Sequence, residues 1–173
     1  MLIFRIIIIL FLLLANNFGY AFANPKLFQI KAFQVYRISN YLAYENNVKQ
    51  ICLVGDRTIR SGFTTFANRS SRISGAEIID YNNYSDKMLE CNIVYLSKKL
   101  GKGNIEFILK KLKPNLDRVI TMSDYDNFIQ NYGGTVEFFK VDNEYRFAIN
   151  SYQKVKKSII VSSKLMEAAD RLY

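Results

Sequence analysis

The chain has 173 residues, of which 50% are hydrophobic and 23% charged, which fits one folded domain, or two at most, and argues against disorder. It contains no histidine and only two cysteines, which excludes mechanisms that need an imidazole and zinc sites built from four thiolates. The net charge of +9 raises the question of a nucleic-acid partner, which depends on the compartment.

Residues 1–23 have the pattern of a secretory signal peptide. Arg5 supplies a positive charge, and the apolar run 6–15 is roughly half the length of about 20 residues that a spanning helix needs. Ala21-Phe22-Ala23 fits the small-x-small rule, so we expect cleavage between Ala23 and Asn24. An uncleaved N-terminal anchor is the alternative.

Export limits the possible partners of the mature domain, residues 24–173. An exported protein does not meet genomic DNA, so we expect no nucleic-acid partner. The basic charge then indicates solubility, or attraction to an anionic membrane or an acidic partner. Its lysines occur in clusters, for which solvated helix faces are the simpler interpretation. The clusters are Lys98, Lys99 and Lys102; Lys110, Lys111 and Lys113; and Lys154, Lys156 and Lys157.

The first part of the mature chain alternates helical and strand patterns. The runs at 50–55 and 91–96 are continuously apolar, which is typical of strands buried on both faces. Gly101-Lys102-Gly103 lacks the spacing of a phosphate-binding loop, and we interpret it as a turn. The predicted elements are helices 27–44, 58–67 and 104–112 and strands 50–55, 77–81, 91–96 and 118–122.

The second part predicts a hairpin between short helices. Ser123 or Asp124 is expected to cap a helix that ends at Gln130. Strands 135–141 and 144–150 flank Asp142-Asn143, a two-residue turn. Further predicted elements are a short basic helix after Asn150, an apolar segment at 159–161, and a final helix that is capped by Ser162-Ser163 and aligns Leu165, Ala168, Ala169 and Leu172.

These elements predict an α/β fold in a single compact domain. Its mixed sheet is parallel in the first part, closes with a C-terminal antiparallel hairpin, and is flanked by helices.

The sequence offers no set of residues that suits catalysis. Asp124 and Asp126 are better explained as helix-capping carboxylates than as a catalytic dyad. No serine has a histidine to act as its base. We therefore predict that the protein is not an enzyme, with no catalytic residue, no metal site and no cofactor.

Cys52 and Cys91 are the only cysteines, and each lies near the start of a predicted strand. Because an exported compartment is oxidising, we expect them to form a disulfide. Two buried free thiols are the alternative.

Two surface features suggest binding. Ile159, Val161 and Met166 fall outside the predicted stripe of the last helix and could form an exposed partner-binding cluster, although a short buried strand is the simpler interpretation. Polar residues also follow three predicted strands, where α/β folds bind small ligands. These are Gly55-Asp56, Ser97-Lys98 and Ser123-Asp124.

Several segments together resemble the YfiR family. Gln-Ile-Cys-Leu-Val-Gly (50–55) and Glu-Cys-Asn-Ile-Val-Tyr-Leu-Ser (90–97) are similar to its paired cysteine strands, and Arg-Val-Ile-Thr-Met-Ser-Asp (118–124) to its next strand. Its C-terminal block resembles three further segments, Gly-Gly-Thr-Val-Glu-Phe-Phe (133–139), Tyr-Arg-Phe-Ala-Ile-Asn (145–150) and Ile-Ile-Val-Ser-Ser-Lys-Leu-Met (159–166). The chain departs from the pattern twice: residues 40–47 lack the Trp-Pro of many members, and residues 128–138 lack a second cysteine pair.

The resemblance implies a periplasmic regulator of cyclic-di-GMP signalling. Such a protein binds the periplasmic domain of an inner-membrane diguanylate cyclase and holds the cyclase inactive, and an outer-membrane lipoprotein can sequester it. A homodimer is compatible with the sequence. A periplasmic small-ligand sensor is the alternative function.

Overall fold

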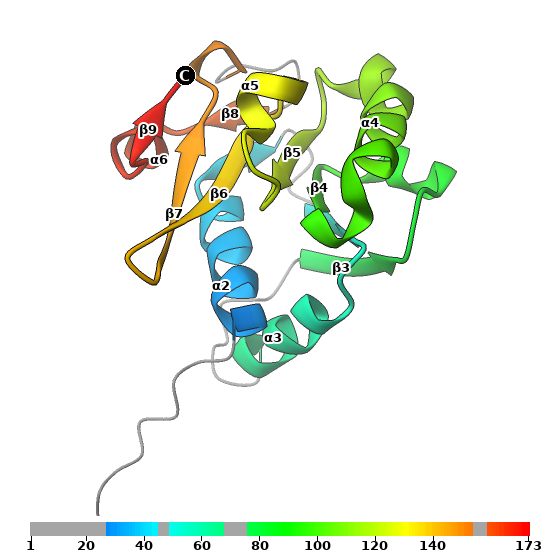
Figure 1. Ribbon diagram of the computed structural model, residues 1–173, viewed down its shortest axis with the longest axis horizontal. Helices are drawn as coiled ribbons and strands as arrows, with labels where there is room; N and C mark the ends of the chain where they lie inside the picture. Colours follow the sequence, from blue (N-terminus) through cyan, green and yellow to red (C-terminus); the bar gives the residue numbers. More distant parts are fainter. Residues whose placement is uncertain (1–26, 45–48, 68–75, 154–158) are drawn as a thin grey trace, which may run out of the picture.

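The computed structural model describes residues 27–44, 49–67, 76–153 and 159–173, and the predicted signal peptide lies outside these ranges. The protein has an α/β fold with one seven-stranded mixed sheet and a separate two-stranded sheet (Figure 1). The strands of the large sheet lie in the order β3-β2-β4-β5-β6-β7-β9. Their bounds are β2 Lys49–Val54, β3 Ala76–Tyr81, β4 Ile93–Leu96, β5 Ile120–Ser123, β6 Val136–Val141, β7 Glu144–Ile149 and β9 Arg171–Leu172.

The large sheet is parallel from β3 to β6, as predicted for the first part of the chain. β7 then runs antiparallel to β6, and β9 pairs parallel to β7. Asp142 and Asn143 connect β6 to β7 with φ angles of 46° and 68°, which confirms the predicted turn.

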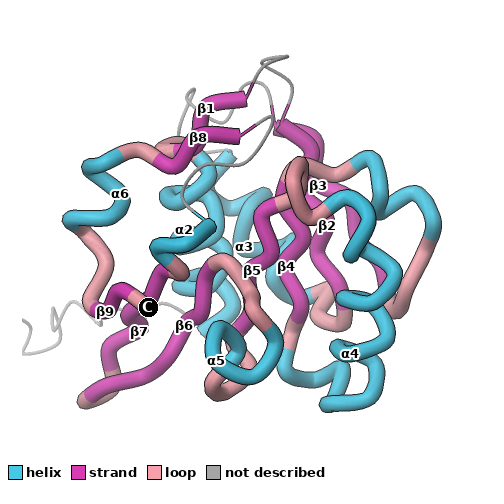
Figure 2. The backbone as a smooth tube through the Cα atoms, turned by 90° about the horizontal axis from the view of Figure 1, so that it is seen from above, coloured by secondary structure: helices cyan, strands magenta, loops and turns pink. Residues whose placement is uncertain are grey.

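Helices cover both faces of the large sheet. Figure 2 shows α2 and α3 on one side of the strands and α4 on the other. The core is accordingly divided in two, because successive side chains of a strand point to opposite faces. In β2, Ile51 and Leu53 pack toward α2 and α3, whereas Cys52 and Val54 pack toward α4. The α-helices are α2 Leu27–Ser39, α3 Thr58–Ala67, α4 Gly101–Leu112, α5 Phe128–Tyr132 and α6 Ser163–Glu167.

The first helix is shorter than predicted. It ends at Ser39, and Leu42–Tyr44 forms β1, which pairs antiparallel with β8, Ile159–Val161. Not every apolar side chain of this helix is buried, since Phe33 is 44% exposed.

The predicted cap of α5 is wrong as well. Asn127, in the left-handed region with φ of 57°, is the N-cap residue of α5. The Glu137 carboxylate on β6 accepts hydrogen bonds from the backbone N–H groups of Asn127 and Ile129, at 3.0 and 3.1 Å. The free amides at this helix start are therefore satisfied by a neighbouring strand, which leaves Asp124 available for another contact.

The bounds of α4 and α6 also differ from the prediction. Gly101 begins α4, where a turn was expected. α6 starts at Ser163 with the predicted cap, Ser162, but ends at Glu167, and Leu172 belongs instead to β9 with 55% exposure. The stripe predicted for the last helix therefore does not form, because the chain returns to the sheet.

Candidate functional site

The sheet order places a topological switch point between β2 and β4. From β2 the chain moves to β3 on one side, and it then returns to β4 on the other side. The carboxyl ends of the two strands diverge there into Gly55-Asp56 and Ser97-Lys98. In open α/β sheets a crevice at this position is the usual place for a ligand.

Asp56 is the charged residue that follows β2. Its side chain is buried, accepts hydrogen bonds from the backbone N–H and the hydroxyl of Thr58 at 3.2 and 2.6 Å, and pairs with the Lys99 ammonium at 2.9 Å. Burial alone would raise the pKa of Asp56, but the hydrogen bonds from Thr58 and Lys99 outweigh it and lower the pKa. Asp56 therefore stays ionised and fixes the first turn of α3.

Gly55 allows this turn. Its φ of 81° lies in the left-handed region, and a Cβ there would come within 2.5 Å of the Leu100 side chain. Only glycine can therefore stand between β2 and Asp56 so close to the Leu100 side chain.

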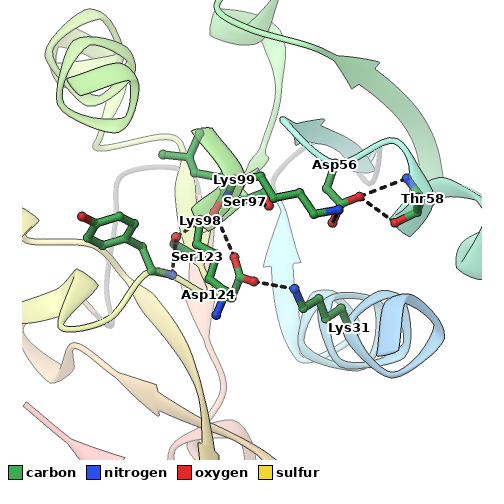
Figure 3. A network of polar contacts seen from close by, with 10 residues as sticks. Lys31, Asp56, Thr58, Ser97, Lys98, Lys99, Ser123 and Asp124 are labelled. Atoms are coloured by element: carbon green, nitrogen blue, oxygen red, sulfur yellow. Dashed lines mark hydrogen bonds and ion pairs between the residues drawn. The ribbon is translucent and has the colours of Figure 1, made fainter. Parts of the chain in front are cut away.

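Asp124, after β5, forms the second ion pair. One carboxylate oxygen binds the Lys31 ammonium at 2.5 Å, and the other accepts the backbone N–H of Lys98 at 2.7 Å. The side chains of Lys31 and Asp124 are only 6% and 3% exposed. Figure 3 shows Lys31 reaching from α2 toward Asp124, with the Asp56 and Lys99 pair alongside. This network joins α2 to the ends of β2, β4 and β5.

Tyr95, on β4, is fully buried, and its hydroxyl lies close to the Asp124 carboxylate without forming a hydrogen bond of good geometry to any described residue. Burial raises the pKa of Tyr95 well above its ordinary value, and the negative charge of Asp124 raises it further. The hydroxyl therefore stays protonated.

A pocket of about 190 Å³ opens beside these ion pairs. It combines an apolar wall with two ammonium groups and one carboxylate. Its lining residues are Leu27, Phe28, Lys31, Asp56, Thr58 and Lys99. The volume is below the range of drug-sized pockets, about 300–1,000 Å³, and suits a small polar molecule.

The structure brings together the three pairs that follow the strands. Asp56, Lys98 and Asp124 belong to one network, in which Ser123 donates a 2.7 Å hydrogen bond to the carbonyl of Leu96. Sequence reasoning missed Lys31. The sequence signal that could have indicated it is its position on the helix face that also carries Val35 and Ile38, both of which are fully buried.

The other predicted residues lie elsewhere. Cys52 and Cys91 are buried and joined as a disulfide with a Cα–Cα distance of 6.1 Å. Val161 is only 8% exposed, and Met166 is half-buried against the core. The side chain of Ile159, like the junction of Ala23 and Asn24, lies outside the described residues.

The described residues hold no group of three His, Cys, Asp or Glu side chains that could bind a metal ion. Nor does any helix within these ranges have the length and apolar character needed to cross a membrane.

Comparison with curated protein sequences gives no match. Among solved structures, the chain is similar to one described as the ABC domain in complex with L-Trp from Streptococcus pneumonia, with a TM-score of 0.55 and 9% identity. The match covers 82% of this chain and 62% of that one, so this chain spans less than two thirds of its length. This likeness shows the fold alone. The YfiR/HmsC-like family model matches residues 28–170, which include the cysteine pair and the whole network at the switch point, and the chain therefore belongs to the YfiR/HmsC-like family.

Proposed function

We propose that this protein is an exported periplasmic regulator that binds the periplasmic domain of an inner-membrane diguanylate cyclase, represses it, and so lowers the output of cyclic-di-GMP. The family match over residues 28–170 carries the proposal, because membership of this family is consistent with a periplasmic regulator of diguanylate cyclase signalling. The Cys52–Cys91 disulfide supports an oxidising compartment. No catalysis is part of the proposal, and an outer-membrane lipoprotein that sequesters the regulator is a compatible further partner.

The test is to co-express the chain with an inner-membrane diguanylate cyclase that has a periplasmic domain, taken from the same organism, and to measure cellular cyclic-di-GMP. The full chain should lower the level, whereas a matched variant lacking residues 1–23 should stay in the cytoplasm and leave the level unchanged. Equal repression by both forms, or none by the full chain when it is found in the periplasm, would contradict the proposal.

We further propose that the β8–α6 segment contacts the cyclase. Met166 is half-buried and retains surface for a partner, whereas the buried Val161 would hold β8 against the core. Met166→Glu should preserve the thermal unfolding midpoint of the wild type and weaken repression, whereas Val161→Asp should lower the midpoint. A folded Met166→Glu variant with full repression would place the contact elsewhere.

The pocket favours a second candidate function, a periplasmic small-ligand sensor. Lys31 and Lys99 offer ammonium groups, and Leu27 and Phe28 offer an apolar wall, a combination that suits a small organic anion. Lys99 is 60% exposed, so its ammonium group can contact a ligand carboxylate while it remains paired with the buried Asp56.

Ligand binding is tested by thermal unfolding with benzoate, with L-tryptophan, and with the uncharged benzamide as the control. A rise in the midpoint with either carboxylate that is lost in Lys99→Gln would support a sensor. No rise with either compound, or the same rise with benzamide, would argue against an anion site.

A further inference from the structure

The outer face of α4 combines positive charge with an exposed aromatic ring. α4 buries Ile105, Ile108 and Leu112 against the sheet and turns its other side to solvent. We call this side the α4 basic face, and it consists of Lys102, Phe107, Lys110 and Lys111 together with the neighbouring Tyr84. Figure 2 places α4 at the opposite side of the molecule from α6 and β9.

Positive charge is concentrated around this face. Residues 98–118 contain seven basic and two acidic residues, so this stretch contributes +5 to the chain's net charge of +9. Glu106 lies only 3.8 Å from Lys102 in an exposed pair, and Asp86 accepts a hydrogen bond from the Tyr84 hydroxyl at 2.7 Å. Lys99 is paired with Asp56, so the excess charge of the face itself comes mainly from Lys110 and Lys111, for which the described residues provide no ion-pair partner.

Phe107 is the apolar ring of this face on α4 and is 47% exposed. Its ring packs edge-on against Tyr84, with centroids 5.7 Å apart. The Lys111 ammonium lies 5.6 Å from the Phe107 centroid and 6.0 Å from that of Tyr84. An apolar ring is therefore held at the surface among ammonium groups, which is the arrangement that suits the boundary between lipid headgroups and acyl chains.

The composition of the face favours lipid over protein. Six of the seven basic residues in 98–118 are lysines, which are depleted in protein interfaces, where arginine is enriched. Clusters of lysine are instead typical of surfaces that bind anionic lipids through charge.

We propose that the α4 basic face docks the protein onto an anionic phospholipid bilayer, with the lysines near the headgroups and Phe107 inserted between them. Docking restricts the protein to the membrane surface and leaves α6 on the far side. The proposal does not depend on the identity of the cyclase.

The test is co-sedimentation of the purified mature protein with vesicles of phosphatidylethanolamine and phosphatidylglycerol, compared with vesicles of phosphatidylcholine. Binding should require phosphatidylglycerol and should fall steeply between 0.05 and 0.5 M NaCl, as roughly expected for screened charges. Lys110→Gln/Lys111→Gln should reduce the partition coefficient about 30-fold, at about fivefold per lysine. Phe107→Ser should also reduce the partition coefficient, and the fold reduction should be larger at high salt than at low salt.

The matched control is Lys140→Gln/Lys164→Gln, which removes the same charge from β6 and α6 and should change partitioning by less than about twofold. Equal losses from both double variants would show that net charge alone drives binding and would overturn the proposal. It would also fail if the protein ignored phosphatidylglycerol vesicles, or if the α4 variant lost affinity for the cyclase domain but not for lipid.

Discussion

Two buried carboxylates determine how the elements pack at the switch point. Asp56 and Asp124 are both buried, and each is satisfied by an ammonium group and by at least one backbone N–H. Removing one member of such a pair leaves an uncompensated charge, which costs more than the pair itself contributes. The network therefore holds α2 on the sheet in one position.

Asp56 makes the stability of the domain depend on pH. Its pKa is lower in the folded protein than the ordinary value of 3.8, so its contribution is present above that pH and is lost as the pH falls through the folded value. Asp56→Asn should reduce the free energy of unfolding by about 1–3 kcal/mol at pH 7, and the difference from the wild type should shrink below about pH 4. Urea unfolding across this range measures it. Asp142→Asn, in the exposed turn, is the control and should show a much smaller difference.

For a substitution of Tyr95 we expect a change in stability of the opposite sign. Because its buried hydroxyl forms no hydrogen bond of good geometry to any described residue, Tyr95→Phe removes an unsatisfied polar group without changing the packing of the ring. The variant should be as stable as the wild type or more stable by up to about 1 kcal/mol. A loss of more than that in urea unfolding would mean that the hydroxyl is bonded. Tyr84→Phe, whose hydroxyl donates to Asp86, should gain nothing.

At the scale of elements, two helices meet at a glycine. Gly62 on α3 lies against α2, where an added Cβ would come within 2.7 Å of the Ala32 Cβ and 2.9 Å of the Phe28 carbonyl oxygen. The first turn of α2, which lines the pocket, is therefore positioned by the absence of a side chain on its neighbour.

Gly62→Ala should lower the free energy of unfolding by about 1–3 kcal/mol, since the helices must separate to admit the methyl group. Gly103→Ala is the matched control, because a Cβ there meets nothing within 4 Å, and it should raise stability by about 0.5–1 kcal/mol through helix propensity. Thermal unfolding of both variants measures the effects. Equal stabilisation by both substitutions would show that α2 and α3 do not pack this closely.

The sequence predicts the elements whose signals are local. The buried strands β2 and β4 follow from continuous apolar runs, and the β6–β7 hairpin follows from Asp142-Asn143. β1 was missed because the apolar spacing of Leu42 and Ala43 fits a helix equally well, and its partner β8 is more than one hundred residues away. The capping of α5 by Glu137 was missed for the same reason, since only the folded sheet brings that carboxylate to the helix.

The same limit applies to the candidate site. Asp56, Lys98 and Asp124 could be grouped because the ends of parallel strands share one edge of a sheet. Lys31 could not be placed, because its partner depends on how α2 lies across that edge.

At the scale of the whole molecule, the disulfide joins β2 to the turn that precedes β4, on the face that packs against α4. Replacing Cys52 and Cys91 by alanine should lower stability by up to about 4 kcal/mol, as expected for a closed segment of 39 residues on the chain-entropy model. Thiol titration of the unfolded, non-reduced exported protein should find no free thiol. Two free thiols, with no loss of stability in the double variant, would show that the disulfide does not form.

The pairing of β1 with β8 also sets an order of events during synthesis. Leu42–Tyr44 leaves the ribosome early, but its partner, Ile159–Val161, exists only after more than one hundred further residues have been made. Contacts this distant in sequence form slowly, and the nascent chain has no second strand to complete the small sheet. The small sheet therefore closes only near the end of synthesis, and until then this part of the chain stays incompletely folded, the form in which a polypeptide can be threaded through a narrow channel.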